Sequence, residues 1–240
     1  MKKFLCLFLL VALIALSLTA CGGNSTADAS GEASASFPAS TDDPFAEQRQ
    51  ILSLVEAFAG AETSGFDYSL EQTLGDTVVN RHTVSVRLDN SNGLGSRVEY
   101  KKNLNTDLSG EQYSELESTT YYRNGKIGAQ ESGVWTWKDG TLAEFVTVNL
   151  QSFRFDLSVL RDVAFAQSGD ETVLTFRIDD ADAATFLGIS QTVKSLSFEI
   201  RADANCEKLL SFTMTYSQEL TSTVFRFSPC IGSVTVIVPD

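Results

Sequence analysis

The spacing of apolar residues changes along the chain from a helical period to a period of two. Behind Asp43, a residue type that caps helices, apolar side chains recur every three or four positions up to Ala59, which predicts a helix with one buried face. From Phe66 onward apolar and polar residues alternate, which predicts half-buried antiparallel strands. Asn124-Gly125 stands between two such runs and is a strong signal for a hairpin turn.

Two further helices interrupt the strand pattern. A capping box, Thr141-x-x-Glu144, and the apolar stripe behind it predict an inward-packing helix that runs to Phe153. A short helix is predicted over 180–187, and a last strand over Val234–Val238. With nine to eleven strands and three helices, the pattern predicts fold class α+β, in which one curved antiparallel sheet wraps around the helices.

The first twenty residues have the build of an export signal, with Lys2 and Lys3 ahead of an apolar run from Phe4 to Leu18. That run is shorter than the ~20 residues that a transmembrane helix needs. The sequence "LTAC", which ends at Cys21, resembles the lipobox of bacterial lipoproteins. The resemblance implies that Cys21 carries a lipid and begins the mature chain; the alternative is an ordinary secretory signal followed by a chance cysteine.

These features divide the chain into a signal peptide at 1–20, a flexible tether at 21–42 and a folded domain at 43–240. The tether consists mainly of Gly, Ala, Ser and Thr, and it cannot bury enough apolar surface to become ordered. We expect the lipid to hold the domain on the extracytoplasmic face of a bacterial membrane. Without the signal, 16 basic and 31 acidic residues leave a net charge of −15, so nucleic acid is not expected as a partner.

The order of motifs in the domain resembles a known family. After the first helix come paired strands with "YYRNGK", a helical insertion behind "VWTW", the short helix "ADAATFLG" and a closing meander that ends in "VTVIVP". This order is similar to that of the half-barrel lipoproteins, which include the lipoprotein carrier and localisation-factor fold and related lipid-binding lipoproteins. The resemblance implies an open half-barrel that binds a lipid or another apolar envelope molecule.

Residues that carry catalysis or bind metal form no recognisable motif. His82 is the only histidine, no nucleophile elbow surrounds it, and a solvated strand histidine is the favoured interpretation. The histidine and the domain's two cysteines lack the spacing of a zinc site. Glu115 and Glu117 share a strand face as a glycosidase pair would, but their polar neighbours indicate a solvent-facing strand. We therefore expect no enzyme activity, no metal and no cofactor.

Apolar bulk is the conspicuous feature of the chain behind the signal, which has fourteen phenylalanines and, on one predicted strand face, Trp135 and Trp137. Most of these side chains are expected in the core. The half-barrel resemblance implies a cavity between the sheet and the helix over Thr141–Phe153, and the candidates to line it are Phe145, Leu150 and Phe153. The alternative function is a tethered module that binds another envelope protein and has a filled core.

Cys206 and Cys230 are the two cysteines of the exported domain, and a disulfide between them is predicted. A three-residue turn between the strands they flank would place them opposite each other. The pattern of apolar residues on these strands instead requires a two- or four-residue turn, which would send the cysteines to opposite faces. Pro229 could reconcile the two by forcing a bulge before Cys230.

Overall fold

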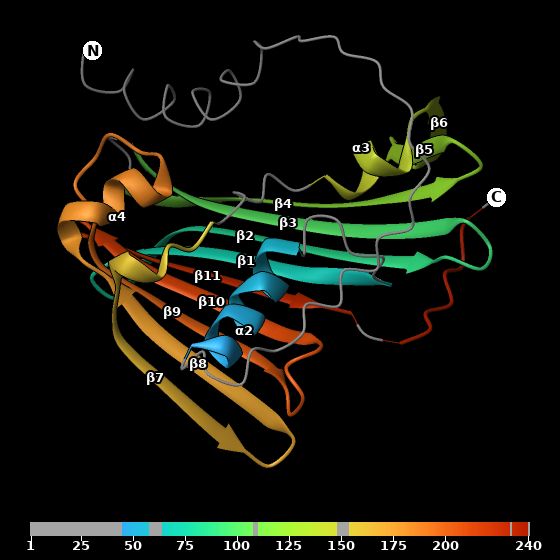
Figure 1. Cartoon of the computed structure of the whole chain (residues 1–240). Helices are drawn as coiled ribbons and strands as arrows, with labels where there is room; N and C mark the ends of the chain where they lie inside the picture. The colour runs from blue at the N-terminus through green and yellow to red at the C-terminus, as the bar shows by residue number, and fades with distance from the viewer. Residues whose placement is uncertain (1–44, 58–63, 108–109, 148–153, 231, 240) are drawn as a thin grey trace, which may run out of the picture. The chain divides into compact units, whose positions relative to one another are not determined.

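A computed structural model describes residues 45–57, 64–107, 110–147, 154–230 and 232–239, all within one compact unit of the chain. The described residues form an open sheet of eleven antiparallel strands with three α-helices, which confirms the predicted α+β half-barrel (Figure 1). The strand order is β6-β5-β4-β3-β2-β1-β11-β10-β9-β8-β7. Neighbouring strands are consecutive in sequence except at β1 and β11, which join the two halves of the sheet.

The strands and helices have the following bounds. In the first half of the sheet lie β1 (Gly65–Leu74), β2 (Thr77–Asp89), β3 (Leu94–Asp107), β4 (Gly110–Arg123), β5 (Lys126–Glu131) and β6 (Val134–Asp139). In the second half lie β7 (Leu160–Ser168), β8 (Glu171–Ile178), β9 (Lys194–Asp203), β10 (Leu209–Gln218) and β11 (Thr221–Pro229). The helices are α2 (Ala46–Ala57), α3 (Leu142–Val146) and α4 (Asp180–Leu187), with a 3-10 turn at Leu157–Val159.

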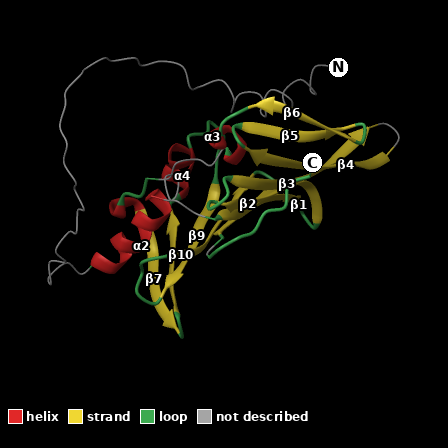
Figure 2. Cartoon of the chain, turned by 90° about the vertical axis from the view of Figure 1, so that its right-hand side faces the viewer, coloured by secondary structure: helices red, strands yellow, loops and turns green. Residues whose placement is uncertain are grey.

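The helices lie on the inner, concave face of the sheet (Figure 2). α2 buries Ile51, Leu52 and Val55 and packs on β9 and β10, as its apolar spacing predicts. α4 packs on β9 and ends at Gly188, whose left-handed φ of 64° suits glycine. The main core therefore fills the space between these two helices and the second half of the sheet.

The helix predicted from Thr141 to Phe153 is shorter than expected. The capping box is present, because the Thr141 hydroxyl accepts from the Glu144 N–H and the Glu144 carboxylate accepts from the Thr141 N–H. The helix nevertheless ends at Val146, and Thr147 has an extended ψ of 112°. A β-branched run, Val146-Thr147-Val148, has a low preference for helix and follows directly on the first turn.

The strand predicted over Val234–Val238 is not formed, and 232–239 has no strand pairing. β11 already has β1 on one side and β10 on the other, so no open edge is available beside it. Side chains hold the segment instead. Val236 is buried and its N–H donates to the Asp89 carboxylate, while Arg123 Nη1 donates to the Pro239 carbonyl at 3.4 Å.

The predicted disulfide is also not formed, since Cys206 and Cys230 are both free thiols in the structure. β10 and β11 are joined by a two-residue turn, the arrangement that the apolar face pattern required, with Phe212 opposite Phe227. Cys206 lies in the turn before β10, where its N–H donates to the Asp203 carbonyl at 2.9 Å. Cys230 follows β11, and its N–H donates to Gly65 of the neighbouring β1 at 2.8 Å.

Candidate functional site

The inner face of the sheet changes from apolar to polar from one strand to the next. The change can be followed along a row of residues that lie opposite one another on neighbouring strands. One row follows the strand register across eight strands and consists of Phe176, Phe198, Met214, Phe225, Leu70, His82, Lys101 and Leu116. Its first members are buried in the main core, whereas Lys101 and Leu116 are exposed. The inner face therefore offers two chemically different regions, one beside α2 and one on β2 and β3.

Aromatic rings fill the apolar region under the helices. The rings of Phe176 and Phe198 stack with centroids 4.8 Å apart, and Phe198 continues to Phe212 at 5.8 Å. Phe155 packs edge-on against Phe176 and lies 5.7 Å from Phe186 of α4. This part of the inner face is packed solid by its own side chains.

A groove of about 340 Å³ lies between α2 and the edge of the sheet at β7 and β8. Its lining consists of Phe45, Gln48, Arg49, Leu157, Ser158, Leu160, Val163 and Leu174. Leu160 and Leu174 are buried, whereas Val163 is 44% exposed. Gln48 Oε1 is buried and has no hydrogen-bond partner among the described residues. The groove is thus an open, mainly apolar site with one buried polar acceptor.

Of the three residues proposed from the sequence to line a cavity, Phe145 is described, and it is not part of the lining of this groove. Phe145 is buried, and its ring packs 5.7 Å from that of Tyr122. A Cβ at Gly95 would lie only 2.6 Å from Phe145 Cε1, so the ring rests directly on the β3 backbone. Leu150, Phe153 and Cys21 lie outside the described residues.

The polar region of the inner face contains a cluster of charges around Glu99 of β3. Glu99 Oε1 lies 2.8 Å from His82 Nε2 and 2.7 Å from Lys101 Nζ, and its Oε2 accepts from Arg97 Nη2 at 3.2 Å. Burial opposes ionisation of Glu99, but the hydrogen bonds from Lys101 and His82 and the charge of Arg97 outweigh it and lower the pKa of Glu99 to about 2. Glu99 is therefore an anion at neutral pH.

His82 belongs to this cluster and is not the solvated strand histidine that the sequence suggested. Its side chain is half-buried, and its ring meets that of Tyr68 edge-on at 5.4 Å. Burial, opposed in part by the hydrogen bond to Glu99, lowers the pKa of His82. Burial, with smaller effects of Tyr216 and Glu99, raises the pKa of Tyr68 to about 12. Both side chains are uncharged at neutral pH.

The sequence missed this cluster because it suggested the wrong face of β3. The rule used for the strands as a whole, that the apolar positions of an alternating run face the core, would bury Val98 and Tyr100, but Val98 is exposed on the outer face. The residues that alternate with them, Arg97, Glu99 and Lys101, point inward. Three charges at every second position of one strand are the signal that could have identified the cluster.

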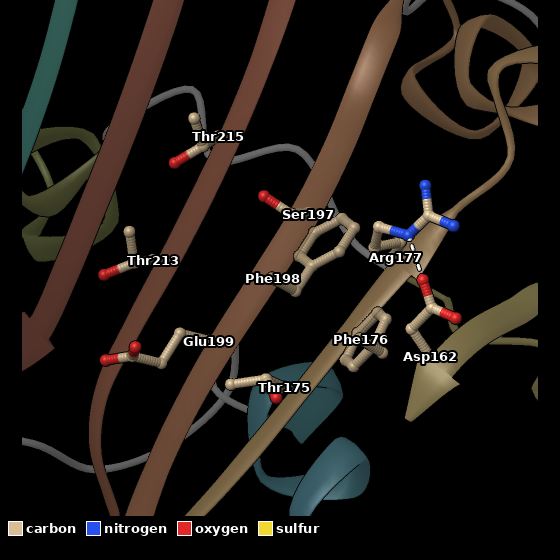
Figure 3. Close-up of a pocket in the computed structure, with 9 residues that line it drawn as sticks. All are labelled: Asp162, Thr175, Phe176, Arg177, Ser197, Phe198, Glu199, Thr213 and Thr215. Carbon is tan, nitrogen blue, oxygen red and sulfur yellow. Dashed lines mark hydrogen bonds and ion pairs between the residues drawn. The ribbon is translucent and has the colours of Figure 1, made fainter. Parts of the chain in front are cut away.

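The outer face carries a polar pocket of about 330 Å³ across β7 to β10 (Figure 3). Hydroxyl groups of Thr175, Ser197, Thr213 and Thr215 surround it, and Arg177 pairs with Asp162 at its rim. Trp135 and Trp137 share one face of β6, as predicted, and that face is the outer one. Glu115 also lies on the outer face, where it pairs with Lys102 at 2.7 Å. The pocket is therefore lined mainly by hydroxyl groups, with one ion pair at its rim.

Neither a metal site nor a membrane-spanning helix is found within the described part of the chain. No three His, Cys, Asp or Glu side chains of these residues are grouped so that they could hold a metal ion. None of the helices described there combines the length and apolar character needed to cross a membrane.

No family model matches the sequence, and no curated protein is similar to it. Similar solved structures include LprF from Mycobacterium bovis, with 12% identity and a TM-score of 0.40 over 81% of this chain and 96% of that one. The hypothetical protein CT021 from Chlamydia trachomatis has 9% identity and a TM-score of 0.28 over 78% and 97%. The LolA superfamily protein NE2245 from Nitrosomonas europaea has 8% identity and a TM-score of 0.24 over 78% and 94%. Similarities of this size do not transfer a ligand or an activity to the chain.

Proposed function

We propose that the domain binds a lipid or another apolar envelope molecule, without converting it, in the groove between α2 and the β7–β8 edge. The observation that carries this proposal is the groove itself, whose volume of about 340 Å³ lies within the range of small-molecule sites. Its buried floor is formed by Leu160 and Leu174, and its open side by Val163. An apolar chain laid there would remove these side chains and its own surface from water.

The groove also contains a feature that suits an amphiphile better than a pure hydrocarbon. Gln48 Oε1 is a buried acceptor without a partner among the described residues, and such a group is costly unless something donates to it. A hydroxyl or amide N–H at the end of an apolar chain would supply that hydrogen bond. The ligand class we propose is therefore an acyl chain with a neutral hydrogen-bond donor at or near its head.

We propose in addition that the domain is anchored to the extracytoplasmic face of a bacterial membrane through a lipid on Cys21. The lipobox-like sequence and the tether at 21–42 support this proposal. Since the cysteine thiol is the group that accepts the lipid, Cys21→Ser is expected to leave an uncleaved precursor or to release the protein into the soluble fraction. A Cys21→Ser variant of mature size that stays with the membrane fraction would contradict the proposed lipid anchor.

The groove is tested by uptake of a fluorescently labelled fatty alcohol, whose head group is a neutral hydroxyl donor, by the wild type and two matched variants. Val163→Glu places a carboxylate in the wall of the groove, and because Val163 is 44% exposed its stability should change by no more than about 0.5 kcal/mol. Because the bound chain would strip water from this carboxylate, uptake is expected to weaken at least tenfold. Val134→Glu is the control, since Val134 is 64% exposed on the other edge strand, β6, away from the groove.

A second candidate function, a tethered module that binds an envelope protein, is favoured by the edge strand β7. All of its side chains after Leu160 are exposed, including Val163 and Phe165, and its outer edge has no neighbouring strand among the described residues. An extended peptide could add to that edge. A wild-type domain that takes up no apolar probe would refute lipid binding in the groove and favour this second candidate.

A further inference from the structure

We propose that the inner face of β2 and β3 holds a second binding site, in which Lys101 and His82 bind an anionic phosphate or carboxylate group. The proposal does not depend on the groove beside α2, because the two sites lie in different halves of the sheet. It rests on the charge balance, the hydrogen-bonding capacity and the apolar surroundings of the Glu99 cluster.

The cluster is a positive spot on a strongly acidic chain. The whole chain has a net charge of −13, yet the cluster combines two cations, Arg97 and Lys101, with one carboxylate, Glu99. The inner positions of β1, β2 and β4 that the structure describes carry no formal charge when His82 is neutral. A surplus positive charge therefore remains on this part of the inner face, where an anion is attracted.

The two cations have different roles. Arg97 has its guanidinium bound to the carbonyls of Phe145 and Thr147 and to Glu99, so it is held in place and balances the charge of Glu99. Lys101 pairs with Glu99 alone among the described residues, and its side chain is 46% exposed. An ammonium group has three N–H donors, so Lys101 can donate to an incoming anion without leaving Glu99.

His82 lies opposite Lys101 in the strand register and completes the site. One ring nitrogen, Nε2, is bonded to Glu99, and the other has no hydrogen-bond partner within the described residues. An anion beside the ring favours the protonated imidazole, which donates from both nitrogens. Binding is therefore expected to couple to proton uptake by His82, which is faced by Tyr68 of β1 and by Arg97, Glu99 and Lys101 of β3.

Apolar side chains flank the site along the same row of paired residues. Leu70 lies opposite His82, and Leu116, which is 61% exposed, lies opposite Lys101. An anionic group that carries an alkyl chain can contact both leucines, whereas a free anion cannot. The shared chemistry is the anion, and its source is either a lipid head group or a small solute.

The test is calorimetric titration of the folded domain, residues 43–240, after a thermal melt has confirmed that it and its variants fold. Inorganic phosphate and decyl phosphate are the two anionic probes, and decyl maltoside is the neutral one. Lys101→Gln is expected to weaken the binding of both anionic probes at least tenfold. Lys102→Gln is the matched control, because the neighbouring lysine pairs with Glu115 on the outer face.

Tighter binding of decyl phosphate than of inorganic phosphate would identify a lipid head group as the source, and equal binding would identify a free anion. With sulfate, whose charge is constant over the range, affinity should rise as the pH falls from about 8 to about 5, and His82→Gln should remove that rise. The proposal is overturned if neither anion binds, or if Lys101→Gln binds as well as Lys102→Gln. Val163→Glu should leave anion binding unchanged. The outcome for the anion site is therefore independent of whether the groove beside α2 binds a lipid.

Discussion

Replacing Gly95 by alanine would add one methyl group at the point where the Phe145 ring rests on β3. That methyl carbon would lie 2.6 Å from Cε1 of Phe145 and 3.2 Å from Cδ2 of Leu88, and contacts under 3.0 Å require something to move. The backbone of Gly95 is held by pairing with Leu88 on β2 and Tyr122 on β4, so the ring must give way. Its position is constrained in turn by the short helix α3.

The magnitudes follow from the burial of Phe145, which is 2% exposed. Overpacking a filled core by one methyl group costs about 1–3 kcal/mol, and we expect Gly95→Ala to fall in this range. Phe145→Ala removes the ring and leaves a cavity, for which about 3–5 kcal/mol is expected. In the double variant the new methyl group no longer meets the ring and fills part of the cavity. Its loss of stability should therefore be smaller than the sum of the two single losses by about 1 kcal/mol or more.

Urea unfolding of the wild type, both single variants and the double variant measures all four free energies in one experiment. The analogous pair of Gly128→Ala with Trp137→Ala, on the outer face, is a second test of the same geometry, because a Cβ at Gly128 would lie 2.7 Å from the Trp137 ring. Strictly additive losses for Gly95 and Phe145 would refute the contact. They would also reopen the possibility that Phe145 borders an unfilled cavity.

Three other results are expected. The pKa of Glu99 in the folded protein, about 2, lies below its ordinary 4.5. Ionised Glu99 therefore stabilises the fold above pH 4.5, and this stabilisation is lost as the pH falls from 4.5 toward 2. The free energy of unfolding of Glu99→Gln should lack that decrease between pH 4.5 and 2. Thiol labelling of the unreduced, denatured domain should modify both Cys206 and Cys230, and absence of label on both would support the disulfide predicted from the sequence. Gly65→Ala should cost more than about 3 kcal/mol in urea unfolding, since Gly65 has a φ of 129° and an added Cβ would lie 2.0 Å from the Val86 carbonyl oxygen; a near-neutral result would refute that backbone geometry.

Local signals in the sequence predicted local structure well. The helix at 180–187 has the predicted ends because Gly188 supplies the left-handed residue that stops it. The turn at Asn124-Gly125 joins β4 and β5 as expected, with positive φ at both residues. In each of these cases the residues that determine the structure are adjacent in the chain.

The errors arose where distant residues decide the outcome. The apolar stripe around Phe145 gave no sign that one turn of helix was enough to place that ring over Gly95, some fifty residues earlier in the chain. Alternation on β3 showed that its two faces differ, one apolar and one charged. It did not show which of them lies on the inner face of the sheet, because that depends on the pairing with other strands. The groove beside α2 depends on the contact between a helix and an edge strand about 110 residues apart, which no local pattern encodes.

The junction of β1 and β11 sets the order in which the domain can fold. Nine of the ten strand pairings join consecutive strands and close short loops, whereas this one brings Leu70 opposite Phe225. Closing so long a loop has a large entropic cost and slows folding. Each meander can form its hairpins first, but the inner face is complete only when the Phe66 and Phe227 rings meet, 5.6 Å apart, across the junction. Chains that have not yet made this pairing would expose two unpaired edges, β1 and β11, in addition to β6 and β7, and would be most prone to aggregate at that stage.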